Sequence, residues 1–175
     1  MEPKDIALSK AADIGQDAPL QRLFEKYPQS KANYWAVVDF NKPSNEKRLF
    51  IFDLKNGAFK AYLVAHGKNS GELYATDFSN VNGSNKSSLG IYKTAETYIG
   101  KHGNSLRIDG LENTNSNARD RDIVIHKADY AVPNYNATGR AGRSEGCFAV
   151  NPTVIAEVIE HLKKGSYLIA CHNQE

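Results

Sequence analysis

The chain of 175 residues is expected to fold as a mainly β domain of the α+β class, with one helix near its C-terminal end and a short helical extension at its N-terminus. Short β-branched and aromatic runs follow one another from residue 34 onward, and Gly-, Asn- and Ser-rich segments separate them. After that point only residues 152–164 combine helical periodicity with end signals. We place the extension at residues 1–30 and the main domain at residues 31–175.

The expected elements follow in chain order. A first helix should run from residue 17 to residue 27, capped by Asp17 and with Pro19 in its first turn. Residues 34–40, 48–54 and 58–66 are typical of strands, and Asn56-Gly57 between the last two indicates a hairpin. Further strands are expected at residues 91–99, 105–108, 123–126 and 166–171.

Two irregular segments and one helix complete this layout. Residues 67–90 are rich in Gly, Ser and Asn, and a loop of that length in a compact domain is usually functional or disordered. Residues 133–146 form a second polar loop, which leads directly into Cys147. The helix at residues 152–164 should be capped by Asn151, begin with Pro152 and end at Gly165.

Composition excludes several classes of function. The formal net charge is +2 and the basic residues are scattered, which does not favour nucleic-acid binding. The sequence has no run of about 18 apolar residues, so no membrane span is predicted. The first residues also lack the pattern of a secretory signal. We therefore expect a cytoplasmic monomer with no membrane insertion. The alternative is a periplasmic protein whose signal peptide has been removed.

The chain has two cysteines, Cys147 and Cys171, which is too few for a disulfide framework. A single bridge between them is an alternative in an oxidising compartment. Cys171 lies in the expected terminal strand, where a buried and inert thiol is the simplest interpretation.

Cys147 is the best candidate nucleophile, because it follows Gly146 at a turn and precedes an apolar run. A thiol needs a base, and His126 ends a β-branched strand 21 residues upstream. Together they predict a Cys/His acyl-transfer site. His66 ends a strand in the same way and is the rival base, while His102 is a turn residue that can also line a site. The structural alternative is a small, buried core cysteine.

A zinc site is a further alternative, since His66, His126 and Cys147 are all possible ligands. No pair of them has the short spacing that is typical of zinc sites, so we predict neither a metal nor a cofactor. Arg140 and Arg143 precede the cysteine, and arginine binds carboxylates through two parallel hydrogen bonds. They are candidate substrate-binding residues, or else exposed loop residues.

Two more residues adjoin the candidate nucleophile. Ser144 is expected to bond the nearby backbone and shape the turn. Glu145 should point away from the thiol, because a carboxylate facing inward raises the pKa of the thiol.

With these residues laid out, the chain resembles the YkuD-type L,D-transpeptidase catalytic domain, and most of all its divergent murein branch. The motif of that family is a His, a spacer and then Ser-x-Gly-Cys, which here are His126 and residues 144–147. Further matches lie at residues 64–67, 78–80, 87–92, 110–112 and 142–144, and the resemblance covers roughly residues 34–171. The chain departs from the family pattern at Glu145, where His or Arg is frequent, and at Ala149, where a basic residue is usual.

The resemblance implies a β-sandwich-like fold and action on peptidoglycan stem peptides or muropeptides. It implies that Cys147 attacks the carbonyl between diaminopimelate and D-Ala, that His126 moves the proton, and that the backbone N–H groups of Gly146 and Cys147 hold the oxyanion. Ser144 belongs to the same motif. The candidate substrate-binding residues are Arg143, Arg140, His66, Ser88 and Tyr92.

Our first functional hypothesis is an L,D-carboxypeptidase that trims tetrapeptides to tripeptides in muropeptide recycling. The alternatives are an exported L,D-transpeptidase, a wall-attacking effector, and a peptidoglycan-binding module without turnover.

Overall fold

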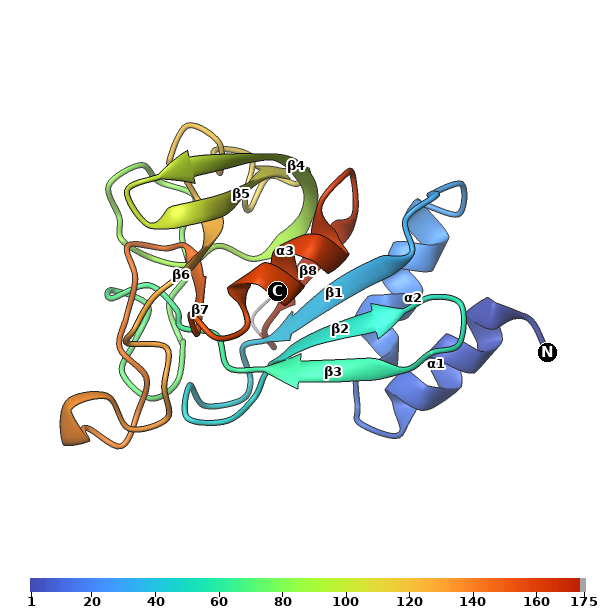
Figure 1. Cartoon of the computed structure of the whole chain (residues 1–175), viewed down its shortest axis with the longest axis horizontal. Helices are drawn as coiled ribbons and strands as arrows, with labels where there is room; N and C mark the ends of the chain where they lie inside the picture. The colour runs from blue at the N-terminus through green and yellow to red at the C-terminus, as the bar shows by residue number, and fades with distance from the viewer. Residues whose placement is uncertain (174–175) are drawn as a thin grey trace.

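The computed structural model describes residues 1–173 (Figure 1). Its helices are α1 (Pro3–Ala12), α2 (Asp17–Lys26) and α3 (Ile155–Leu162), with a short 3-10 turn, η1, at Tyr135–Ala137. Its strands are β1 (Tyr34–Asp39), β2 (Leu49–Asp53), β3 (Phe59–Tyr62), β4 (Gly90–Gly100), β5 (Gly103–Gly110), β6 (Val124–Lys127), β7 (Phe148–Val150) and β8 (Tyr167–Cys171).

The eight strands form one sheet in the order β3-β2-β1-β8-β4-β5-β6-β7. The pairs β1–β8 and β6–β7 are parallel, and the other neighbours are antiparallel. Just beyond β3, Ala65 forms a bridge with Ala149 of β7, so the two edges of the sheet meet. The expected mainly β fold is confirmed, and its sandwich-like form comes from one continuous sheet that curves around a core.

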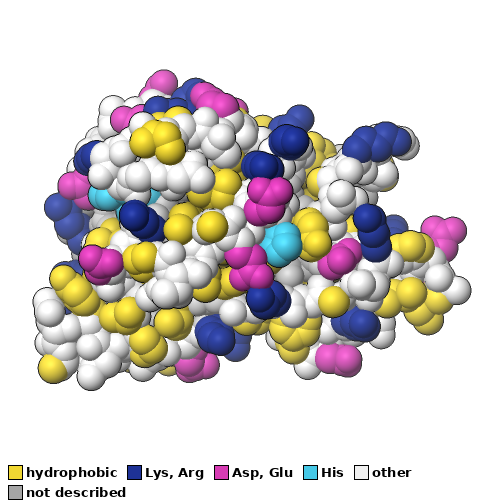
Figure 2. Space-filling view, viewed as in Figure 1, with side chains coloured by type: hydrophobic (Ala, Val, Ile, Leu, Met, Phe, Trp, Pro, Cys, Tyr) yellow, Lys and Arg dark blue, Asp and Glu magenta, His cyan; other side chains and the backbone are white. Residues whose placement is uncertain are grey.

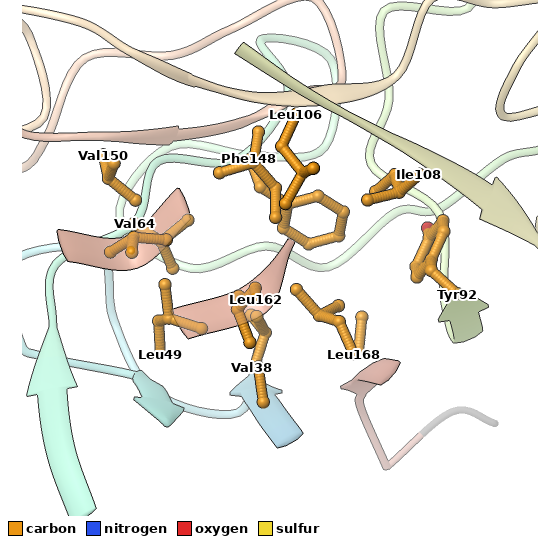
Figure 3. Packing of buried hydrophobic residues seen from close by; sticks show 14 of the residues in the cluster. Val38, Leu49, Val64, Tyr92, Leu106, Ile108, Phe148, Val150, Leu162 and Leu168 are labelled. Carbon is orange, nitrogen blue, oxygen red and sulfur yellow. The ribbon is translucent and has the colours of Figure 1, made fainter. Parts of the chain in front are cut away.

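Alternation along the strands divides the apolar residues between two faces of this sheet. In β1, Ala36 and Val38 belong to the inner core, whereas Trp35 and Val37 belong to a second cluster on the outer face. Figure 3 shows the inner core, where the ring of Phe148 lies among side chains from several strands. Helix α3 contributes to the same core through Ile155, Val158, Ile159 and Leu162.

The N-terminal helices cover part of the outer face. Ala7, Ala11, Leu20 and Leu23 are fully buried and share the second cluster with residues of β1, β2 and β8. In Figure 1, α1 and α2 lie behind strands β1 to β3. Arg22 and Lys26 of α2 also form ion pairs with Glu112, so the helices are tied to the loop after β5 as well.

Three element boundaries differ from expectation. Helix α2 begins after Gln16, which is its N-cap residue in place of Asp17. Strand β3 ends at Tyr62, because the chain then leaves β2 and turns toward β7. Helix α3 begins only at Ile155. Asn151 instead organises the preceding turn, where its Oδ1 accepts the Thr153 N–H at 2.9 Å.

Within residues 1–173, no helix is long and apolar enough to cross a bilayer. Basic and acidic side chains are interspersed over the face seen in Figure 2, which agrees with the small net charge of the sequence.

Candidate active site

Strands β6 and β7 place Cys147 and His126 on the same face of the sheet. His126 pairs in register with Ala149, and Ile125 pairs with Phe148. Cys147 lies two residues before Ala149, so alternation directs it to the face that carries His126. Ile125 and Phe148 point the opposite way, into the inner core. The apolar residues of both strands therefore fix where the two polar side chains emerge.

Both side chains open into one pocket of about 680 Å³. Its walls come from the β4–β5 hairpin, the loop before β6, the segment after β6 and the turn before β7. The lining residues are Lys68, Tyr98, Lys101, His102, Arg107, Arg121, Asp122, Val124, His126, Tyr130, Arg143, Ser144, Glu145 and Cys147.

The Cys147 thiol is held between two backbone groups. Its Sγ accepts the Val124 N–H at 3.4 Å and donates to the Asp122 carbonyl oxygen at 3.2 Å. Burial raises the pKa of the Cys147 thiol to about 11, and the negative charges of Asp122 and Glu145 add to that shift, against the Val124 N–H, which lowers it. The resting nucleophile is therefore a protonated thiol.

His126 is held as a neutral base. Its Nδ1 lies 2.8 Å from the Lys127 carbonyl oxygen, which can only accept, so Nδ1 carries the proton and Nε2 keeps the lone pair. Burial lowers the pKa of His126, and the nearby charges of His102 and Lys101 act in the same direction. A neutral thiol and a neutral imidazole that line the same pocket favour proton transfer that accompanies attack on a substrate over transfer that precedes it.

The turn between Ser144 and Cys147 is closed by the serine. Ser144 Oγ accepts the Gly146 N–H at 3.1 Å and donates to the Cys147 carbonyl oxygen at 2.7 Å. The expected turn-shaping role of Ser144 matches these two bonds. In this conformation the Gly146 N–H is engaged by the hydroxyl, so its expected role as an oxyanion donor stays a prediction.

His66 lies behind this turn and outside the pocket. Its side chain is fully buried, with Nδ1 at 2.8 Å from Arg48 Nη2 and Nε2 at 3.0 Å from the Gly71 carbonyl oxygen. Its own carbonyl oxygen accepts the Ser144 N–H at 2.9 Å. His66 thus supports the catalytic turn, and in this conformation neither ring nitrogen is available to a substrate or to Cys147.

The zinc alternative gains no support from this arrangement. Among residues 1–173, no three or more His, Cys, Asp or Glu side chains are grouped so that they can hold a metal ion. No disulfide joins Cys147 and Cys171 in the structure, so the alternative of a bridge between them is not realised there.

Ser88 and Tyr92 are also buried, and their hydroxyl groups bond to each other. The Tyr92 ring meets the Phe148 ring edge-on, with 5.4 Å between centroids. The two residues therefore lie on the core side of β7 and are not among the residues that line the pocket.

Comparisons with known proteins identify the family of this domain. Residues 17–171 match the family model of the L,D-transpeptidase catalytic domain. The chain belongs to this family. Two solved structures with a TM-score of 0.51 are an L,D-transpeptidase from Mycobacterium smegmatis (14% identity, covering 81% of this chain and 59% of that one) and L,D-transpeptidase 3 from Mycobacterium tuberculosis (11% identity, 80% and 61%).

The helical cell shape determining protein Pgp2 from Campylobacter jejuni is similar at the same TM-score of 0.51, with 13% identity over 98% of this chain and 55% of that one. At such identities the likeness shows the fold, and this chain spans about three fifths of the length of these proteins. No curated protein sequence matches the chain.

The two candidate arginines of this L,D-transpeptidase domain are placed differently. Arg143 lines the pocket, and its Nη1 donates to the Lys68 carbonyl oxygen at 2.9 Å. Arg140 is not a lining residue and forms an ion pair with Glu72 at 3.3 Å. Glu145 is exposed at the pocket rim, 4.0 Å from the Lys68 ammonium group. Its side chain is thus largely solvent-exposed, yet it lines the pocket and its charge raises the pKa of the Cys147 thiol, so the expectation that Glu145 points away from the thiol is met only in part.

The sequence analysis did not identify Arg121, Asp122 and Lys101 as site residues. Arg121 fixes the residue 67–90 loop, donating to the carbonyl oxygens of Ser79 and Lys86 at 2.9 and 2.7 Å. Asp122 has a φ of 55°, a left-handed conformation from which its carbonyl meets the thiol. The available signal was a run of alternating charges at residues 119–122, directly before the strand that carries His126.

Proposed function

We propose that this L,D-transpeptidase domain acts on peptidoglycan stem tetrapeptides, at the bond between the L-centre of diaminopimelate at position three and D-Ala at position four. The observation that carries the proposal is the placement of His126 in β6 and of Cys147 directly before β7, the parallel neighbour of β6, with both side chains open to one pocket. A thiol, an imidazole with a free Nε2 and space for a peptide are the requirements of cysteine acyl transfer.

The proposed reaction has two steps. In the first, Cys147 Sγ forms a bond to the diaminopimelate carbonyl carbon while His126 Nε2 takes the thiol proton. The C–N bond to D-Ala then breaks, and the departing amine receives that proton from His126. In the second, an acceptor attacks the thioester and restores the free thiol, with His126 again as the base.

The charges of the pocket suit such a substrate. A stem peptide of this type carries several free carboxylates, and five of the lining side chains are cationic: Lys68, Lys101, Arg107, Arg121 and Arg143. Arg121 and Arg143 already donate to backbone carbonyls. Lys101 stands where the pocket meets a second cavity, so its ammonium group is well placed to meet a substrate carboxylate.

Water as acceptor gives an L,D-carboxypeptidase, which is our first candidate. The second candidate is an L,D-transpeptidase with an amine acceptor. One observation favours it: a second cavity of about 470 Å³ shares Lys101, His102 and Tyr130 with the catalytic pocket. Such a neighbouring cavity offers room for an acceptor on the far side of the histidines.

The test is mass spectrometry of the protein incubated with a disaccharide-tetrapeptide, with and without an added D-amino acid. Tripeptide formation with little exchange identifies a carboxypeptidase, whereas exchanged or dimeric products identify a transpeptidase. Absence of any product while Cys147 is still alkylated by iodoacetamide contradicts the proposed substrate and favours a binding module.

Two cysteine variants form a matched pair for this assay. Cys147→Ser should reduce turnover by about three orders of magnitude or more, because the hydroxyl is a far weaker nucleophile at this position. Cys171→Ser should keep wild-type turnover, because Cys171 belongs to the outer-face cluster with the N-terminal helices. Full activity of Cys147→Ser contradicts the cysteine mechanism.

A further inference from the structure

Two imidazole rings lie face to face at the wall of the catalytic pocket. The ring centroids of His102 and His126 are 4.0 Å apart, and the ring planes differ by only 9°. His126 belongs to β6, while His102 comes from the β4–β5 turn, 24 residues earlier in the chain. Both rings line the catalytic pocket, and His102 also lines the second cavity.

The hairpin that carries His102 is built to reach this position. Lys101 and His102 form its two-residue turn, between the paired glycines Gly100 and Gly103. Gly103 has a φ of 80°, a backbone conformation that residues other than glycine rarely adopt. The tight turn therefore depends on the glycine at this position. Pairing of β5 with β6, in which Leu106 faces Ile125, then fixes the tip beside His126.

The stack has two physical consequences for His126. First, the His102 ring covers one face of the imidazole and keeps water from it, which disfavours the charged form. Second, protonated imidazoles in face-to-face contact repel each other, and Lys101 adds a further positive charge on the same turn. Both effects maintain His126 as a base with a free lone pair, which is the form that acyl transfer requires.

We propose that His102 is a positioning residue for the reaction: its ring, stacked on the His126 imidazole, fixes the orientation of that imidazole and keeps it neutral. The inference rests on the proposed role of His126 as the base. It adds a residue that no motif assigns, and it connects the β4–β5 hairpin to the chemistry of β6.

The other ionisable groups around His126 set the background for any test. They come from its own strand, from the hairpin, from the loops on either side of β6, from the residue 67–90 loop and from the turn before β7. These groups are Lys127, Lys101, Tyr98, Arg107, Arg121, Asp122, Tyr130, Lys68, Arg143, Glu145 and Cys147. All of these groups are retained in the variants below, since Cys171 and His161, which are also replaced, do not belong to the set.

The experiment is an NMR titration of the His126 ring resonances in the wild-type protein, His102→Ala and His102→Phe. In His102→Ala, the pKa of His126 should rise by about half a unit or more, toward its ordinary value, because cover and charge are both lost. His102→Phe keeps an aromatic ring over His126, so its titration should lie closer to the wild type than that of His102→Ala. An unchanged His126 titration in His102→Ala, or identical titrations in the two variants, overturns the proposal.

A second readout links the titration to reactivity without any peptidoglycan. In a Cys171→Ser background, the rate of Cys147 alkylation by iodoacetamide is measured against pH. The acidic limb of that profile should move to higher pH in His102→Ala, by the same shift as the His126 titration, and His102→Phe should restore much of it. An acidic limb that does not follow the titration contradicts the role of His102.

The matched control is His161→Ala. His161 also contacts an aromatic ring, that of Tyr34, with 4.2 Å between centroids and ring planes tilted by 33°, but it lies on α3 and outside the catalytic pocket. Its loss should change neither the His126 titration nor the alkylation profile. Because none of these readouts uses a muropeptide, failure of the proposed substrate and failure of this inference give different results.

Discussion

Cys147 and Phe148 are neighbours in the chain, yet they serve opposite faces of the sheet. Phe148 fills the inner core and meets Tyr92 edge-on, while Cys147 opens into the pocket. The other predicted site residues likewise fall into two groups, those that line the pocket and those that are buried behind it. Tyr92 and His66 are buried and do not line the pocket, so their expected contact with a substrate stays a prediction.

Tyr92→Phe tests this division at a single atom. The change removes a buried hydroxyl that bonds Ser88, and a lost buried hydrogen bond costs about 1 kcal/mol of unfolding free energy. Urea denaturation should show that loss, while KM for the tetrapeptide should stay at its wild-type value. Tyr74→Phe is the control, since Tyr74 is exposed and should change neither quantity. An increased KM with unchanged stability would return Tyr92 to the substrate-binding residues.

At the scale of elements, hydrogen bonds and close packing from neighbouring segments hold the turn of residues 144–147 in place. Its Ser144 backbone bonds both to His66 and to the N–H of Lys68, at 2.9 and 2.7 Å. Gly146 has a φ of 120°, and a Cβ on it would lie 2.8 Å from the Lys86 carbonyl oxygen. The glycine is therefore required twice, for its backbone conformation and for the close approach of the residue 67–90 loop.

Gly146→Ala and Gly139→Ala separate these two requirements. Both positions have positive φ, so each alanine should cost about 1–2 kcal/mol of unfolding free energy from backbone strain alone. A Cβ at Gly139 meets nothing within 4 Å, whereas the one at Gly146 clashes with backbone. Gly146→Ala should therefore be clearly the less stable variant in thermal or urea denaturation, and it alone should slow alkylation of Cys147. Equal losses of stability would contradict the crowding at Gly146.

At the scale of the whole molecule, the features that can be predicted from the sequence are those that depend on hydrophobic alternation and on turn residues. The mainly β fold and the helical N-terminus follow from such local patterns, and so does the placement of Cys147 and His126 at the ends of short strands. The catalytic roles of these two residues stay predictions. The remaining site residues depend on contacts between distant segments. His102 reaches His126 through a hairpin register, and the His66 ring is bonded to Arg48 instead of lining the pocket. No local pattern reports either event.

One such distant network lies around Arg48, a fully buried arginine that bonds backbone carbonyl oxygens and an imidazole instead of a carboxylate. Its guanidinium group donates to the Val64 and Lys42 carbonyl oxygens and to His66 Nδ1. Burial, followed by the charge of Arg48, lowers the pKa of His66 to about 4. Protonation of His66 would place two cations side by side in the interior. The stability of the folded protein should therefore depend on the pH through His66.

This coupling predicts the pH dependence of stability. The unfolded chain takes up a proton on His66 near its ordinary pKa of about 6.5, whereas the folded protein does so only near about 4. Between those two values the unfolded state binds more protons, so the contribution of His66 to stability falls as pH falls. The shift corresponds to at most about 3 kcal/mol of unfolding free energy, lost between about pH 6.5 and about pH 4.

Urea denaturation of the wild type and of His66→Gln, at steps from pH 7 to pH 4, measures this contribution. Glutamine cannot be protonated in that range, so the other titrating groups affect both proteins alike. The stability advantage of the wild type over His66→Gln should therefore shrink steadily as the pH is lowered through this window. Parallel curves for the two proteins would show that His66 takes up its proton equally in the folded and unfolded states, which is incompatible with a ring buried against the Arg48 guanidinium group.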